Sequence, residues 1–376
     1  MEFRDLKRQY EYLKEDMDKA IQDVITDGQF IMGKQVMELE KVLSEYVGKK
    51  HCITCANGTD ALQLALMAWD IGPGDAVFVP DFTFFSSGEV VVTVGATPIF
   101  VDVCNQTYNI DTESLKMMIE KVKTEGKLVP KVIIAVDLFG QPANYDEIKK
   151  IAKENNMFIL EDAAQGFGGK IGKDVACSFG DISITSFFPA KPLGCYGDGG
   201  AIFTDDDEWN GMIRSLRVHG KGVSKYDNIR IGMNSRLDTL QAAVLLTKFS
   251  VFVQEEMEAI QTIARKYTKE LMGLVKTPIV LNGYVSSWAQ YTIQLADKVQ
   301  RDGLQEYLKR NGVPSMIYYQ KPMHCQRAFE HIRYNHADYK VTNRLCDTVL
   351  SLPFHPYMAI EEVSYVTELI KGYLKE

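Results

Sequence analysis

The sequence predicts an α/β protein built on a largely parallel sheet. Between residues 51 and 204, short runs of β-branched and apolar residues alternate with stretches in which apolar residues recur at helical spacing. Strands that alternate with helices pair in parallel, because each helix returns the chain to the start of the next strand. At 376 residues the chain is also long enough for more than one domain.

Two helices are expected before the first strand. Apolar residues recur at helical spacing from Tyr10 to Ile21 and from Val36 to Leu43, and Gly28 and Gly33 separate the two runs. Strands and helices then alternate. The strands are expected at His51–Cys55, Ala76–Pro80, Thr97–Val101, Lys131–Leu138, Met157–Glu161, Ile182–Ser186 and Gly200–Thr204, and the helices at Asp60–Trp69, Asp111–Val122 and Tyr145–Asn155.

The pattern changes after about residue 235. Leu237–Glu258 predicts one long helix, and Ile260–Leu271 continues as helix. We therefore place a boundary near residue 245, between a large α/β domain (1–245) and a smaller α+β domain (246–376). The smaller domain is expected to hold strands at Trp288–Leu295 and Met316–Tyr319 and helices at Arg301–Asn311 and Glu361–Leu374.

Charge and hydropathy limit the partners. The net charge of −8 gives no general positive field for a nucleic acid, so none is expected as a partner. No window approaches the roughly 18 apolar residues of a membrane helix, so no membrane insertion is expected. Met1–Asp5 lacks the pattern of a signal peptide, which predicts a cytoplasmic protein.

The cysteines and histidines indicate no metal site. Seven cysteines, an odd number, favour reduced thiols over a disulfide framework. Cys52 and Cys55 form a C-x-x-C, but no second Cys or His pair follows at zinc-finger spacing, so two buried thiols are expected. The same argument from ligand spacing finds no metal site at His219, His331, His336 and His355.

Ligands of α/β proteins bind where strands end and helices begin, and four predicted strand ends carry suitable residues. After the first strand, Gly58 and Thr59 begin a helix whose free N–H groups suit a phosphate. A turn followed by an ordinary N-cap, with no ligand, would have the same sequence pattern. In the loop 81–87, Phe84 or a neighbouring ring could lie flat on a heterocycle or simply plug the core.

The other two strand ends carry opposite charges. Asp162 ends a very apolar strand, where a buried carboxylate needs a cationic partner unless it serves only as a helix cap. Lys191 stands among apolar and glycine residues, which suits a desolvated amine for Schiff-base chemistry, although it could also extend to solvent. A phosphate cup, a ring, a carboxylate and an amine are together what a pyridoxal phosphate (PLP) site requires.

These segments resemble the DegT/DnrJ/EryC1/StrS family of nucleotide-sugar aminotransferases. The resemblance runs from Asp5 to Pro356, and it lies closest to the branch that aminates UDP-2-acetamido-2-deoxy-3-oxo-glucuronate for bacterial surface polysaccharides such as lipopolysaccharide O-antigen. It implies the aspartate-aminotransferase fold (fold type I), with a mostly parallel seven-stranded sheet and PLP bound to the large domain. The motifs that carry it are residues 56–62, 161–165, 186–191 and 234–238.

The resemblance also implies a role for each matching residue. Lys191 would form the Schiff base with PLP and move protons, and Asp162 would pair with the pyridinium nitrogen. Gln165 would reach the phenolic oxygen and Phe84 would stack on the ring. The phosphate would be held by Gly58, Thr59 and Ser186, and by Asn234 from the neighbouring subunit, which implies a homodimer.

One departure from the family pattern concerns the cofactor. Position 190, often Ser or Thr in the family, is Ala190 here, so one possible hydroxyl contact to the phosphate is missing. Lys191 itself is present, whereas family members that dehydrate their substrates carry histidine at that position. The resemblance therefore favours transamination from L-glutamate to a nucleotide-linked ketosugar, with ping-pong kinetics.

Four residues are candidates for contact with the substrate. Arg236 is the candidate that binds the carboxylates of glutamate and of the uronate in turn, or else forms an intersubunit salt bridge. Tyr318, Tyr319 and His324 match the family segment near the sugar nucleotide, although aromatic core packing would explain them equally well.

Three other functions are weighed against this one. A nicotinamide oxidoreductase is disfavoured because the glycines of 166–172 have the wrong spacing for a dinucleotide fingerprint. A PLP-fold protein without catalysis would not need Lys191, Asp162 and Gln165 together. The remaining alternative is an aminotransferase that acts on a 4-keto-6-deoxy UDP- or dTDP-sugar.

Overall fold

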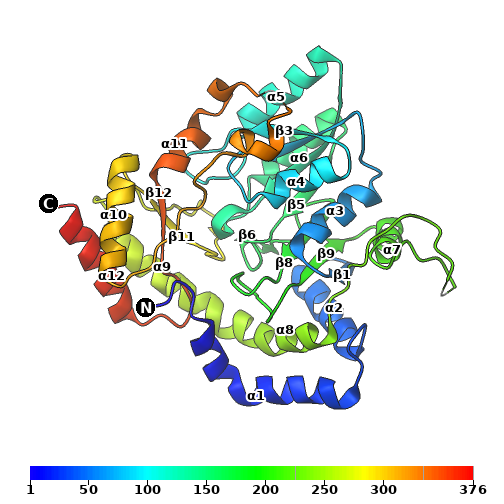
Figure 1. Cartoon of the computed structure of the whole chain (residues 1–376), viewed down its shortest axis with the longest axis horizontal. Coiled ribbons are helices and arrows are strands. Elements are labelled where there is room, and N and C mark those ends of the chain that lie inside the picture. The colour runs from blue at the N-terminus through cyan, green and yellow to red at the C-terminus, as the bar shows by residue number, and fades with distance from the viewer. Residues whose placement is uncertain (225, 333, 376) are drawn as a thin grey trace.

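The computed structural model describes residues 1–224, 226–332 and 334–375 and has a seven-stranded central sheet (Figure 1). The strand order is β1-β9-β8-β5-β4-β2-β3. Only β9 runs antiparallel to its neighbours, so the expectation of a mainly parallel sheet is confirmed. The strands are β1 (His51–Cys55), β2 (Asp75–Pro80), β3 (Thr97–Val101), β4 (Val129–Val136), β5 (Phe158–Asp162), β8 (Ile182–Ser186) and β9 (Gly200–Thr204).

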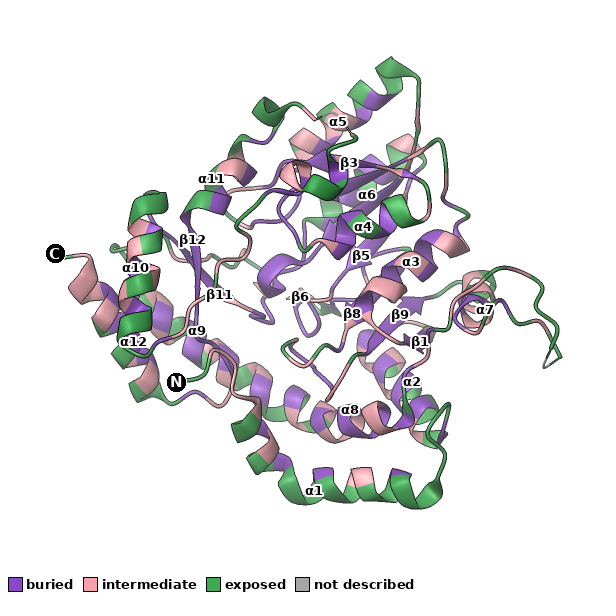
Figure 2. Cartoon of the chain, in the orientation of Figure 1, coloured by how far each residue is buried: buried purple, intermediate pink, exposed green. Residues whose placement is uncertain are grey.

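Helices cover both faces of this sheet, so its strands are buried on both sides (Figure 2). Within β2, Ala76 and Phe78 pack into the core on one face, and Val77 and Val79 pack into the core on the other. The first core also takes residues from α1 (Leu6–Asp27), α2 (Lys34–Val47), α5 (Thr112–Glu125), α6 (Tyr145–Asn155) and α8 (Thr239–Val251), and the second from α3 (Gly58–Ala68), α4 (Ser86–Thr93) and α7 (Asp207–Leu216).

A third core lies in the C-terminal part of the chain. The helix α8 continues through a π-helical stretch, Phe252–Glu256, into α9 (Met257–Leu271), whose Ile260 is the first residue of this core along the chain. Residue 245, where the sequence analysis places the domain boundary, lies inside α8, and that boundary stays a prediction. The other elements of this part include α10 (Lys298–Arg310), α11 (Lys340–Thr348), α12 (Ile360–Tyr373), β11 (Tyr291–Gln294) and β12 (Val349–Leu352).

The prediction of a strand at Met316–Tyr319 is wrong. Met316 exchanges two backbone hydrogen bonds with Ser351, but the chain then leaves β12. Ile317, Tyr318 and Tyr319 instead line a cavity beside the central sheet. The sequence analysis also missed three two-residue strands, β6 (Lys170–Ile171), β7 (Asp174–Val175) and β10 (Tyr284–Val285), which form a small antiparallel sheet of their own.

All seven cysteines are free thiols, as their odd number predicts. Cys52 and Cys55 are both buried in β1, which confirms that this pair is part of the core. Burial also raises the pKa of the Cys55 thiol to about 12, so it stays protonated at neutral pH. No helix within the described ranges has both the length and the apolar content that crossing a membrane requires.

Candidate active site

A cavity of about 940 Å³ opens at the carboxyl ends of the parallel strands. The sequence analysis named most of the functional residues that line it, and the chain brings them together from widely separated segments. The predicted residues in the lining are Gly58, Thr59, Phe84, Asp162, Gln165, Ser186, Lys191, Tyr318 and Tyr319.

Asp162 is the last residue of β5, and its carboxylate is buried. Burial raises the pKa of Asp162, whereas hydrogen bonds from Ser87 and Ala164 and the charge of Lys191 lower it. The Ser87 hydroxyl donates to Oδ2 at 2.9 Å, and the Ala164 amide donates to Oδ1 at 3.2 Å. Ser87, which lies in the first turn of α4, is not among the predicted site residues, since one serine gives no signal of its own. A carboxylate fixed in this way suits a cationic ring nitrogen.

Lys191 lies in the loop between β8 and β9, and burial lowers the pKa of its amine. The carboxylate of Asp162 acts in the opposite direction, and the Arg4 guanidinium lowers the pKa further. Arg4 also donates from Nη2 to the Lys191 carbonyl oxygen at 2.7 Å, which ties the N-terminal segment to the lysine loop. Lowering the pKa of an amine increases the fraction that is neutral at neutral pH, and only the neutral form can act as a nucleophile or a base.

The phosphate cup that the sequence predicts would lie at the start of α3, at one side of this cavity. Asn57 caps this helix by accepting a hydrogen bond from the Asp60 amide, so the first N–H groups of the helix are left for a ligand. A Cβ atom added to Gly58 would lie 2.8 Å from the Cβ of Ser186, so only glycine fits there. Thr59 and Ser186 supply hydroxyl groups to the same part of the cavity.

Phe84 lines the cavity and is 55% exposed, and Phe188 is the other exposed aromatic residue of the described lining. A large exposed ring inside a cavity offers a flat face to a heterocycle. Gln165 lies nearby and holds two partners: its Oε1 accepts from the Phe139 amide at 2.8 Å, and its Nε2 donates to the Tyr319 hydroxyl at 3.0 Å. The second hydrogen of this amide nitrogen remains for a ligand oxygen.

Asn234 and Arg236 lie elsewhere. They line a second cavity of about 500 Å³, which shares Asp198 with the first. Within one chain, neither residue belongs to the lining around Lys191. This placement agrees with the expectation that Asn234 acts across a subunit boundary, and that expectation stays a prediction.

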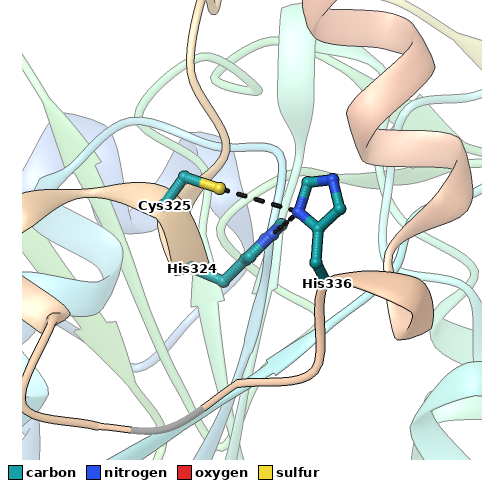
Figure 3. A group of neighbouring side chains, drawn as sticks. All are labelled: His324, Cys325 and His336. Atoms are coloured by element: carbon teal, nitrogen blue, oxygen red, sulfur yellow. Dashed lines mark hydrogen bonds between the residues drawn. The ribbon is translucent and has the colours of Figure 1, made fainter.

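His324 does not occur among the described residues that line the cavity around Lys191. Its Nδ1 lies 2.7 Å from Oδ2 of the buried Asp81, and its Nε2 lies 2.8 Å from Nδ1 of His336 (Figure 3). The expected contact between His324 and the sugar therefore gains no support from its position. Met323 and Gln326, its neighbours in the chain, do line the cavity.

The donor set of the cavity fits PLP. A buried carboxylate stands at one side, the half-buried amine of Lys191 is available for a covalent bond, and the cradle at Gly58 would be filled by any Cβ atom. Ala190 lines the cavity as well, so the cup lacks a hydroxyl there and depends on Thr59 and Ser186.

Comparisons with known proteins agree with this geometry. Residues 11–371 match the DegT/DnrJ/EryC1/StrS aminotransferase family. The chain is 42% identical to the UDP-2-acetamido-2-deoxy-3-oxo-D-glucuronate aminotransferase of Pseudomonas aeruginosa, over 97% of this chain and 98% of that protein.

Solved structures have the same fold. A DegT/DnrJ/EryC1/StrS aminotransferase from Brucella abortus superposes with a TM-score of 0.97 at 48% identity, and the match covers 100% of both chains. The NtdA protein of Bacillus subtilis, solved with bound cofactor PMP, has a TM-score of 0.87 at 28% identity, over 97% of this chain and 82% of that one.

Gly58→Ala is expected to weaken PLP binding about tenfold or more, because an overpacked contact costs about 1–3 kcal/mol. The measurement is a titration of the apo-protein with PLP, followed by absorbance. Gly211→Ala is the matched control, since a Cβ atom there meets nothing within 4 Å. Equal PLP affinity in the two variants would contradict the cradle.

Arg4→Gln is expected to move the pH dependence of PLP capture to higher pH. The Arg4 cation lowers the pKa of Lys191, so its removal raises that pKa, and the neutral amine then forms only at higher pH. The rate of PLP binding to the apo-protein is measured as a function of pH. Arg8→Gln removes an exposed arginine that is paired with Glu362, and it should leave the pH dependence of PLP binding unchanged. A shift to lower pH in Arg4→Gln would exclude this role.

Proposed function

Because this chain belongs to the DegT/DnrJ/EryC1/StrS aminotransferase family, we propose that it transfers the amino group of L-glutamate to UDP-2-acetamido-2-deoxy-3-oxo-glucuronate. It is a PLP-dependent nucleotide-sugar aminotransferase. The product would be the 3-amino sugar, a precursor of bacterial surface polysaccharides such as O-antigen. The observation that carries the proposal is that Asp162 and Lys191 line one cavity, together with the similarity to the Pseudomonas aeruginosa enzyme.

PLP supplies a carbonyl carbon that can take the amino group and a ring that can accept electrons. Lys191 would hold the cofactor and, once displaced by an amino group, would act as the base that moves a proton from the substrate carbon. Its lowered pKa suits that role, because a neutral amine is needed. Asp162 would keep the proton on the ring nitrogen, since its buried carboxylate gains most from a nearby positive charge.

The described lining of the cavity carries three carboxylates, Asp60, Asp162 and Asp198, so an anionic sugar needs cations to bind there. Besides Lys191, the described lining contains one further cation, Lys321. Arg236 would add a guanidinium from a neighbouring subunit and could bind the carboxylates of glutamate and of the uronate in turn. Tyr318 and Tyr319, which also line the cavity, would contact the sugar nucleotide.

A homodimer is part of this proposal. Asn234 and Arg236 line a cavity that also includes Ile31, and Ile31 is exposed together with its neighbours Phe30 and Met32. Three consecutive exposed apolar side chains beside a polar cavity are typical of a surface that another protein covers. A second copy of the chain placed there would bring Asn234 to the partner's phosphate cup.

The cytoplasmic location stays a prediction from the sequence.

A substrate panel tests the function. The PLP-loaded protein is mixed with L-glutamate and with the 3-keto uronate, UDP-2-acetamido-3-keto-glucose (which lacks the uronate carboxylate) or a dTDP-4-keto-6-deoxy sugar, and products are identified by mass spectrometry. We expect the uronate to be aminated with a kcat/KM about tenfold or more above that of the analogue without the carboxylate, because the carboxylate gains a charge-assisted hydrogen bond. Lys191→Ala is the inactive control.

Two outcomes of the panel would contradict the proposal. Amination of the 4-keto sugar with the uronate untouched would support the alternative substrate class. The second outcome is that glutamate converts PLP to its amino form but none of the three sugars is aminated. The protein would then be an aminotransferase whose substrate is not one of these sugars.

Mixing two inactive variants tests the shared site. Lys191→Ala and Asn234→Ala, each inactive alone, are co-expressed with different tags. Random pairing makes half of the dimers mixed, and each mixed dimer has one intact site, so about a quarter of the wild-type activity should return. No recovery in purified mixed dimers would mean that Asn234 acts within its own chain.

A further inference from the structure

His324, Cys325 and His336 come together outside the cavity that holds Lys191 (Figure 3). His324 and Cys325 lie in the short helical turn Met323–Cys325, and His336 begins the turn His336–Asp338. The ligand atoms of all three side chains lie within 4.8 Å of one another. The sequence analysis expected no metal site, because the His and Cys spacings match no metal-binding pattern, and the folded chain supplies the proximity that those spacings do not show.

Two of the three distances between the ligand atoms are close to those of a tetrahedral site. His324 Nε2 and His336 Nδ1 are 2.8 Å apart, and Cys325 Sγ is 3.8 Å from His336 Nδ1. Around a zinc ion, with bonds of about 2.0–2.3 Å, two nitrogen ligands lie about 3.3 Å apart and a nitrogen and a sulfur about 3.6 Å apart. These two distances need shifts of about half an ångström or less, which the exposed His336 side chain can make. The third pair, His324 Nε2 and Cys325 Sγ, lies within 4.8 Å and is adjusted by rotation of the Cys325 side chain.

Asp81 orients the His324 ring as a metal ligand requires. Its buried Oδ2 accepts from His324 Nδ1 at 2.7 Å, and its Oδ1 accepts from the His324 backbone amide at 2.8 Å. With its proton on Nδ1, the ring presents the lone pair of Nε2 toward Cys325 and His336. Tyr339 stacks on the same ring, with a centroid distance of 4.2 Å and an interplanar angle of 19°, and so limits its rotation.

We propose that His324, Cys325 and His336 bind a divalent cation of the zinc type. A thiolate and two imidazoles are the ligands that zinc prefers, and water would take the fourth position because His336 is exposed. On binding, the Cys325 thiol releases its proton to solvent, and the proton on His336 Nδ1 moves to Nε2 by exchange with water. No oxidant or reductant is needed.

The ion would fix one wall of the substrate cavity. Met323 and Gln326 line that cavity and flank two of the ligands in the chain. The segment from 326 to 335 connects the two turns, and a shared ion would tie its ends together. The proposal is independent of which sugar the enzyme aminates, since it concerns residues outside the cavity lining.

The test uses full-length, tag-free, PLP-loaded protein that has been freed of metal with a chelator. Zinc content is measured after equilibrium dialysis against Zn²⁺, and Co²⁺ serves as a spectroscopic probe. We expect about one zinc ion per chain and, with Co²⁺, a thiolate-to-metal charge-transfer band together with the visible bands of tetrahedral cobalt. Cys325→Ser is expected to abolish the charge-transfer band, and His336→Gln to weaken zinc binding about tenfold or more.

Matched controls separate this site from other thiols and histidines. Cys104→Ser removes another partly buried free cysteine, and His331→Gln removes an exposed histidine of the same segment. Both controls should bind zinc and cobalt as the parent protein does. The proposal is overturned if the parent protein binds no zinc, or if stoichiometric zinc and the charge-transfer band persist in Cys325→Ser.

Discussion

The buried carboxylate of Asp162 is the constraint on which the site depends. A carboxylate out of contact with water is costly unless charges and donors surround it, and here the Ser87 hydroxyl, the Ala164 amide and the Lys191 amine do so. The neighbouring Glu161 points to the other face of β5 because side chains alternate along a strand. It is satisfied there by the amides of Cys177, Phe179 and Gly180 and by the Ser183 hydroxyl, so it is not free to pair with Lys191.

The strand order then gathers the remaining groups. β5 pairs with β8 so that Asp162 lies opposite Ile184, two residues before Ser186. Ser186 in turn lies opposite Gly200 of β9, and Gly200 lies opposite Cys55 at the end of β1. The chain that leaves β1 therefore begins α3 at Gly58 beside Ser186. Residues more than 100 positions apart meet because three strands end at one edge of the sheet.

The sequence predicted much of this arrangement and missed the parts that depend on tertiary contacts. The seven central strands were expected because buried parallel strands are continuous apolar runs. Met316–Tyr319 has the same composition but faces a cavity, so its strand prediction was wrong. Lys191 and Asp162 were predicted because charge is rare in such surroundings. The contact of Arg4 with the Lys191 carbonyl joins distant segments, and the cluster at His324 depends on how the chain folds back between two turns, so no local pattern indicates either.

The central claim is that Lys191 is the residue that holds PLP. The most direct measurement is reduction of the PLP-loaded protein with borohydride, which makes the bond between cofactor and lysine permanent, followed by peptide mapping with mass spectrometry. The account predicts one pyridoxyl group per chain, on Lys191, in the peptide that contains Pro189–Gly194. A pyridoxyl group on Lys321, Lys248 or any other lysine, with Lys191 unmodified, would contradict it.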